Sequence, residues 1–189
     1  MAEPNPIERR LGWLRAQYGA FIADDQARLL HWVLAEDERR MMDAFLRVEA
    51  ISGETGDLLL LLDTPFGDPA RYGMELVAEL CELYDALRES LSEAGLADTD
   101  WRPPPPRPAA SRPAGLGGGA APPDVDYLRQ AAASFHAHHQ PLLRHLSLVL
   151  QPARVADPAA LTAWLGAAVQ AFDDPALRLV LVDRAAYPS

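Results

Sequence analysis

Residues Asp57–Asp63 form the run DLLLLLD, in which five consecutive leucines lie between two aspartates. A short, unbroken apolar run bounded by polar residues is typical of a strand that is buried on both faces, as strands of parallel sheets are. Such a sheet needs helices on both sides to cover it. The run therefore predicts an α/β fold with a parallel sheet.

The segment after this run indicates a long helix. Asp68-Pro69 is a good helix start, because Asp caps the first turn and Pro fits its geometry. The chain from Arg71 to Glu93 then places a leucine at every third or fourth position, which predicts an amphipathic helix. The leucines expected to face the core are Leu76, Leu80, Leu83, Leu87 and Leu91.

The same patterns extend over the rest of the chain. Asn5-Pro6 and Asp157-Pro158 are further helix starts. Helices are predicted at 6–22, 36–51, 124–139 and 158–172, and strands at 28–35, 146–150 and 177–182. Because strands alternate with helices, we expect a small, mostly parallel sheet of about four strands flanked by helices.

One segment interrupts this order. Residues 102–123 contain 12 Pro or Gly residues among 22, which predicts a flexible linker with little regular structure. Trp101, directly before the prolines, is expected to stay partly exposed. The linker divides the chain into an N-terminal α/β part, 1–101, and a C-terminal α/β part, 124–189. Each part has too few strands for a sheet of its own, so we expect one domain, although two independent domains remain the alternative.

Composition narrows the class of protein. All 17 basic residues are arginine, which excludes any mechanism that needs a lysine and, because Arg has GC-rich codons, indicates a GC-rich bacterial gene. Cys81 is the only cysteine, so no intramolecular disulfide is possible, as expected in a reducing cytoplasm. We expect neither a signal peptide nor a membrane span, because no apolar run is long enough.

Charge suggests what kind of partner the protein has. The net charge of −10 argues against nucleic acid and anionic membranes as partners. The acids are concentrated in residues 1–101, which hold 21 Asp or Glu against 9 Arg. On the predicted helix 71–93, the candidates for contacting a protein with a basic surface are Glu75, Glu79, Glu82, Glu89 and Glu93. The alternative is a solvated helix face that keeps the protein soluble.

Two strands end in an aspartate. Asp63 follows the leucine run, and Asp183 follows LRLVLV near the end of the chain. Ligands of open parallel sheets bind beyond the carboxyl ends of the strands, so both residues are candidates for a ligand site. The alternative is that each aspartate caps a turn or a neighbouring helix.

This arrangement resembles a reduced P-loop NTPase domain of the AAA/STAND type. The resemblance is topological: 28–35 corresponds to the first strand and 146–150 to the Walker B strand. Where the phosphate-binding motif should stand, residues 35–40 are AEDERR, without the glycines or the lysine. The Walker B position carries Gln151 in place of an aspartate. The resemblance therefore implies a nucleotide-binding domain in which hydrolysis has been lost or was never present, and no residue carries over as catalytic.

Three hypotheses about function follow. The first is a non-enzymatic protein-interaction module of a bacterial cytoplasm, such as an adaptor, a chaperone-like partner or a regulatory subunit, with no cofactor. The second is a degenerate nucleotide-binding domain. The third is a small enzyme or metal site built from the cluster His136, His138, His139 and His145. His136 and His138 lie on different sides of a helix, so these residues more simply fill a helix C-terminus.

Overall fold

The computed structural model describes residues 5–35, 38–52, 57–93, 98–106, 123–140 and 142–184. Its centre is a sheet of four parallel strands, in the order β1-β4-β3-β2. The strands are β1 (Leu29–Leu34), β2 (Asp57–Leu62), β3 (His145–Leu150) and β4 (Leu177–Arg184). The predicted α/β class, with a small parallel sheet, is confirmed.

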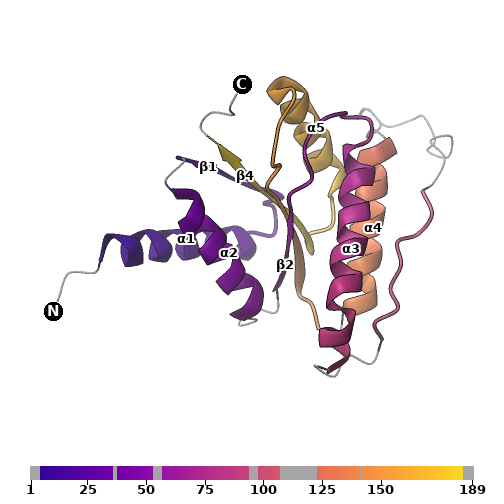
Figure 1. Ribbon diagram of the computed structural model, residues 1–189, viewed down its shortest axis with the longest axis horizontal. Helices are drawn as coiled ribbons and strands as arrows, with labels where there is room; N and C mark the ends of the chain where they lie inside the picture. Colours follow the sequence, from indigo (N-terminus) through magenta and orange to yellow (C-terminus); the bar gives the residue numbers. More distant parts are fainter. Residues whose placement is uncertain are drawn as a thin grey trace.

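Five helices cover the two faces of this sheet (Figure 1). Helices α1 (Pro6–Ala23) and α2 (Arg39–Ser52) lie on one face. Helices α3 (Tyr72–Glu93), α4 (Pro123–His139) and α5 (Pro158–Ala171) lie on the other. Strands β1 and β2 precede the Pro/Gly-rich segment and β3 and β4 follow it, so the sheet takes strands from both sides of that segment.

Two predicted helix starts form as expected. The Asn5 side chain accepts a hydrogen bond from the Ile7 amide at 2.9 Å, and the Glu8 carboxylate accepts one from the Asn5 amide at 3.2 Å. The Asp157 carboxylate accepts hydrogen bonds from the amides of Ala159 and Ala160. These contacts satisfy amides that the helix itself leaves unpaired.

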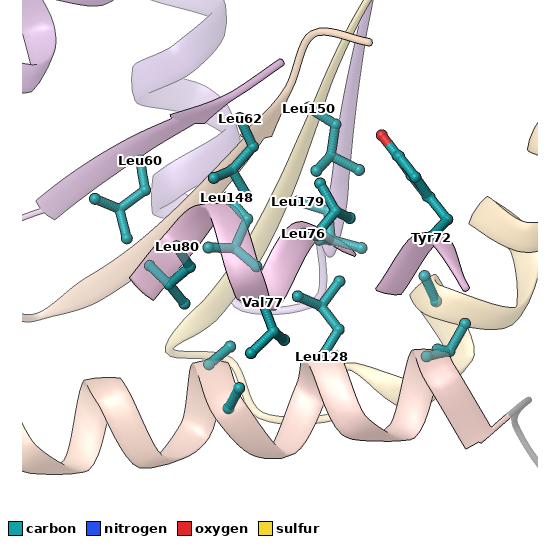
Figure 2. Packing of buried hydrophobic residues seen from close by; sticks show 14 of the residues in the cluster. Leu60, Leu62, Tyr72, Leu76, Val77, Leu80, Leu128, Leu148, Leu150 and Leu179 are labelled. Atoms are coloured by element: carbon teal, nitrogen blue, oxygen red, sulfur yellow. The ribbon is translucent and has the colours of Figure 1, made fainter. Parts of the chain in front are cut away.

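The larger core lies between the sheet and helices α3, α4 and α5. Figure 2 shows strand leucines such as Leu62, Leu148 and Leu179 pointing at Leu76 of α3 and Leu128 of α4. Even-numbered residues of β2 and β3 and odd-numbered residues of β4 face this side, as the alternation of a strand requires.

A second core lies on the opposite face of the same strands. Leu59, Val149 and Val180 pack there against α1 and α2, which contribute Leu14 and Leu46, among others. The sheet is therefore buried on both faces, which explains why the sequence of β2 is an unbroken run of leucines.

The residue directly before the predicted linker, Trp101, is packed against the helices. Trp101 is 3 % exposed and stacks edge-on against Tyr84 of α3 and Phe135 of α4, with ring centroids 5.5 and 4.9 Å apart. The expectation that Trp101 stays partly exposed is wrong, because α3 and α4 together form an apolar seat for the indole. The rest of the linker, 107–122, lies outside the described residues.

Another expectation fails on α3. Leu76 and Leu80 are fully buried, as predicted, but Leu87 is 47 % exposed. Helical periodicity indicates which side of a helix faces the core, but not how far along the helix the core extends. The side chain of Leu91 lies outside the described residues. None of the described helices combines the length and the apolar character needed to cross a bilayer.

Candidate functional site

The carboxyl edge of the sheet is the first place to look for a ligand. Because all strands are parallel, β1, β2, β3 and β4 end at the same edge. Helix α2 follows β1 onto one face, whereas α5 follows β3 onto the other. The chain therefore leaves β1 and β3, the two neighbours of β4, towards opposite faces of the sheet. Open α/β sheets bind their ligands at such a position.

A small crevice opens at this position. Its volume is about 30 Å³, and its walls come from the ends of β1, β3 and β4 and from the first turns of α2. It is lined by Leu34, Ala35, Arg39, Asp43, Gln151, Pro152, Val182 and Asp183. A space of this size accommodates about one water molecule, so it does not by itself favour nucleotide binding.

Asp183, one of the two strand-end candidates, lies in this crevice. Its Oδ2 is 3.2 Å from Nε2 of His31 on the neighbouring strand β1. Both side chains are partly exposed. The Asp183 carboxylate therefore already contacts a side chain of the neighbouring strand. Glu36 and Asp37, which follow the crevice residue Ala35 in the sequence, lie outside the described residues.

A much wider hollow lies at the end of β2, and we call it the acidic hollow. Its volume is about 500 Å³, and it runs between the β2–α3 loop and the exposed side of α3. It is lined by Asp63, Thr64, Pro65, Glu75, Ala78, Glu79, Glu82 and Leu83. The structure thus brings together the strand-end candidate Asp63 and three of the five glutamates that the sequence singled out.

The Glu79 side chain accepts hydrogen bonds from the loop that follows β2. Its carboxylate accepts hydrogen bonds from the amides of Asp63 at 2.8 Å and Thr64 at 3.0 Å, and also from the Thr64 hydroxyl. These contacts tie the end of β2 to α3 and shape one wall of the acidic hollow. The expectation that Glu79 is simply left to solvent is wrong, because the helical pattern says nothing of a loop 16 residues earlier in the chain.

The other four glutamates are less engaged. Glu75 lies 3.7 Å from Arg71 in a partly exposed pair, which contributes little to stability. Glu82 is exposed and lines the acidic hollow. Glu89 and Glu93 are exposed farther along α3 and do not line it. The hollow therefore divides the predicted acidic face into two groups.

The four histidines of the predicted cluster do not converge on one point, although the rings of His138 and His139 contact each other with centroids 4.7 Å apart. His136 contacts the carbonyl oxygen of Arg144 at 3.3 Å, and His138 lies 3.4 Å from Asp98. His139 is buried among aromatic rings of α3 and α4. His145 lies on the opposite face of the sheet from α4. No group of three or more potential metal ligands occurs in the part of the chain that the structure describes.

His145 instead belongs to a buried polar network that the sequence analysis missed. Its Nδ1 is 2.7 Å from Oδ1 of Asp57, directly opposite on β2, and both side chains are nearly inaccessible. Two residues along β3, the Ser147 hydroxyl lies 3.3 Å from the Tyr18 hydroxyl of α1. Burial raises the pKa of Tyr18, so this hydroxyl stays protonated.

Arg178 of β4 is a further buried polar residue on this face of the sheet. It lies opposite Ser147 in the sheet and is fully buried. Its guanidinium donates hydrogen bonds to the carbonyl oxygens of Asp24 and Ala27, which closes the loop between α1 and β1. Burial lowers the pKa of Arg178, and the nearby Arg28 adds to this effect. The sequence signal was a polar residue inside each apolar strand, LSLVL and LRLVLV.

No family model matches the chain, and neither a curated protein nor a solved structure shows significant similarity to it.

Proposed function

We propose that this protein is a non-enzymatic protein-interaction module that binds a basic segment of another protein in the acidic hollow. The observation that carries the proposal is the convergence of Asp63, Glu75 and Glu82 on one open surface, with Glu79 holding its wall in place. None of the described residues that line this surface is basic.

The size and charge of the acidic hollow suit arginine or lysine side chains. A guanidinium pairs with a carboxylate through two parallel hydrogen bonds, which makes acidic surfaces selective for arginine. With about 500 Å³ of open space, the hollow has room for several side chains of an extended segment. The net charge of −10 would in addition attract a basic partner over a distance and raise the association rate.

The geometry also shows how the proposal should be tested. Glu79 is unsuitable for substitution, because its loss would also free the β2–α3 loop. Replacing Glu75 and Glu82 by Gln removes two charges from the hollow and preserves side-chain size. Replacing Glu89 and Glu93 by Gln removes the same charge from the same helix outside the hollow, which provides a matched control.

The first measurement is a titration of a fluorescein-labelled peptide of alternating Arg and Gly with the full chain at low salt. We expect the Glu75→Gln/Glu82→Gln variant to bind the peptide about tenfold more weakly than wild type, and the control variant to lose less than about twofold. Binding should weaken as salt rises. Equal losses in the two variants would show that net charge and not the hollow attracts the peptide.

The second measurement uses the same variants to find the natural partner. Wild type, the hollow variant and the control variant serve as parallel baits in a lysate of the source organism. A partner of the acidic hollow is retained by wild type and by the control, and is lost from Glu75→Gln/Glu82→Gln. If every captured protein is retained by all three baits, the hollow is not the interaction surface.

A further inference from the structure

A short irregular segment, residues 98–106, runs alongside α3 and α4, and we call it the strap (Figure 1). In the described part of the chain, no backbone-to-backbone hydrogen bond joins the strap to another residue. Trp101 is the one residue of the strap that is buried. Side chains alone therefore hold the strap on the two helices.

Trp101 is the main attachment of the strap. Its ring lies edge-on against Tyr84 of α3 and Phe135 of α4. Its indole Nε1 donates a hydrogen bond to the Ser134 hydroxyl of α4 at 3.3 Å. We call Tyr84, Ser134 and Phe135 the seat of Trp101. A buried indole covers a large apolar area, so the strap leaves the helices only when Trp101 leaves this seat.

Two ion pairs hold the strap on either side of Trp101. Arg102 donates a hydrogen bond to the Asp85 carboxylate of α3 at 2.9 Å, and Asp98 lies 3.4 Å from Nε2 of His138 on α4. The side chains of Asp85, Asp98 and Arg102 are at least half exposed, and exposed ion pairs contribute little to stability. A segment with one buried anchor and no backbone hydrogen bonds belongs to the least stable parts of a domain.

His139 lies behind the seat. Its ring contacts those of Phe135 and Tyr84, with centroids 4.7 and 5.6 Å away. The residue is 6 % exposed, and its Nε2 is buried without a hydrogen-bond partner among the described residues. A protonated imidazole has two N–H groups that need partners, so this position disfavours the charged form of His139.

The groups around His139 give a positive charge little support. Tyr84 of α3 is a neutral phenol, because burial raises its pKa. Burial lowers the pKa of His139 itself, and His138 of α4 lowers it further, while Asp98 of the strap acts in the opposite direction. The neighbours from β2 and from the loop before β3 are leucines. While the strap is closed, the imidazole is therefore neutral at pH 7.

We propose that the strap is a pH-sensitive switch: acidification releases Trp101 from its seat while the rest of the domain stays folded. Once the indole leaves, water reaches His139 behind the seat, and the imidazole takes up a proton there. The pKa of His139 is lowered in the closed state and returns towards its ordinary value of about 6.5 in the open state. The open state therefore binds more protons, and it gains population as the pH falls below about 6.5.

His138 works against this release. When protonated, it attracts Asp98 and so holds the strap more firmly. The Asp98 side chain is 68 % exposed, however, so water and salt screen this attraction. The charge on His139 would form at a buried position, where screening is weak. His139 should therefore decide the direction of the pH effect, and His138 should reduce its size.

The test measures hydrogen exchange of the Trp101 indole N–H in the full chain by NMR, with Trp101→Phe used to assign the signal. Protection is expressed relative to N-acetyltryptophanamide at the same pH, which removes the intrinsic pH dependence of exchange. We expect protection to fall about tenfold between pH 7.5 and pH 5, while the amides of β3 stay protected. Equal protection at the two pH values, or its loss together with that of β3, would overturn the proposal.

Three substitutions on α4 then identify the group that titrates. His139→Gln removes the titrating side chain, so the change in protection between pH 7.5 and pH 5 should shrink to less than about twofold. His138→Gln removes the opposing charge and should enlarge the change. His136→Gln is the matched control, because His136 contacts the Arg144 carbonyl oxygen and no residue of the seat, and it should keep the tenfold change. A full pH dependence in His139→Gln would show that another group drives the release, and the proposal would be wrong.

Discussion

The two faces of the sheet are built differently, although they share the same four strands. On the face under α3, α4 and α5, the strand leucines belong to one apolar core, which has a cavity at one end. The face under α1 and α2 is smaller, and its amino-terminal half is occupied by Asp57, His145, Ser147 and Arg178. The strand residues buried on the first face are all leucines, whereas those buried on the second face include polar groups.

The difference shows how a sheet can bury polar and charged side chains. On the α1/α2 face, each buried polar side chain lies on a strand position next to another one, as Asp57 lies opposite His145 and Ser147 opposite Arg178. Asp57 and His145 are held in register by the backbone ladder, so little additional entropy is lost when their side chains pair. Substitutions on the two faces should therefore differ in how they destabilise the protein as well as in how much they destabilise it.

The largest effect is expected from breaking the pair Asp57–His145. The variant His145→Leu leaves the Asp57 carboxylate buried without its partner, and we expect a loss of about 3–5 kcal/mol in the free energy of unfolding. The double variant Asp57→Leu/His145→Leu should recover most of that loss, because two leucines bury no unpaired charge. Urea unfolding of the three proteins measures both values. A double variant as unstable as the single one would contradict the idea that pairing governs this face.

The next effect sharpens the comparison on the other face of the same strand. Leu148 is fully buried between the sheet and α3, and Leu148→Ala should cost about 2–5 kcal/mol through lost burial and a residual cavity. Because Leu148→Ala leaves no polar group without a partner, a second substitution at a neighbouring residue should not restore the lost stability. Thermal unfolding followed by circular dichroism gives the loss, and a change below about 1 kcal/mol would mean that this core repacks easily.

A smaller effect is expected where Gly73 of α3 packs against Asp124 of α4. A methyl group added at Gly73 would overlap the backbone oxygen of Asp124, a clash that only a backbone shift can relieve. That shift would also disturb the hydrogen bond from the Trp164 indole to the Asp124 carboxylate, now 2.7 Å long. We expect Gly73→Ala to destabilise the protein by about 1–3 kcal/mol. Gly166→Ala on α5, where a methyl group meets no other atom, serves as the control and should not destabilise the protein.

The smallest effect concerns pH and the cavity face. The pKa of His139 is lowered in the folded protein, mainly by burial, so the unfolded chain binds more protons between that pKa and its ordinary value of about 6.5. Stability should therefore rise with pH through this window and be lost as the pH falls. His139→Gln should reduce this dependence in urea unfolding between about pH 5 and pH 7.5. An identical pH dependence in both proteins would contradict the lowered pKa.

Much of the candidate site was visible in the sequence as separate parts. Asp63, Glu75 and Glu82 could be named because a strand end and a helical face have local patterns. Their convergence in the acidic hollow could not be predicted, because it depends on how α3 is placed beside the end of β2. The hydrogen bonds of Glu79 to the Asp63 and Thr64 amides depend on the same placement.

The class of fold and the type of each helix and strand could be inferred from the amino-acid sequence alone. The run DLLLLLD required cover on both faces, and the spacing of leucines and the Asn-Pro and Asp-Pro starts placed the helices, because burial and capping leave local patterns. The folded structure was needed to find the strand order β1-β4-β3-β2, the pairing of Asp57 with a histidine 88 residues away, and the exposure of Leu87. These features arise from contacts between distant segments, and local periodicity carries no information about which segments meet.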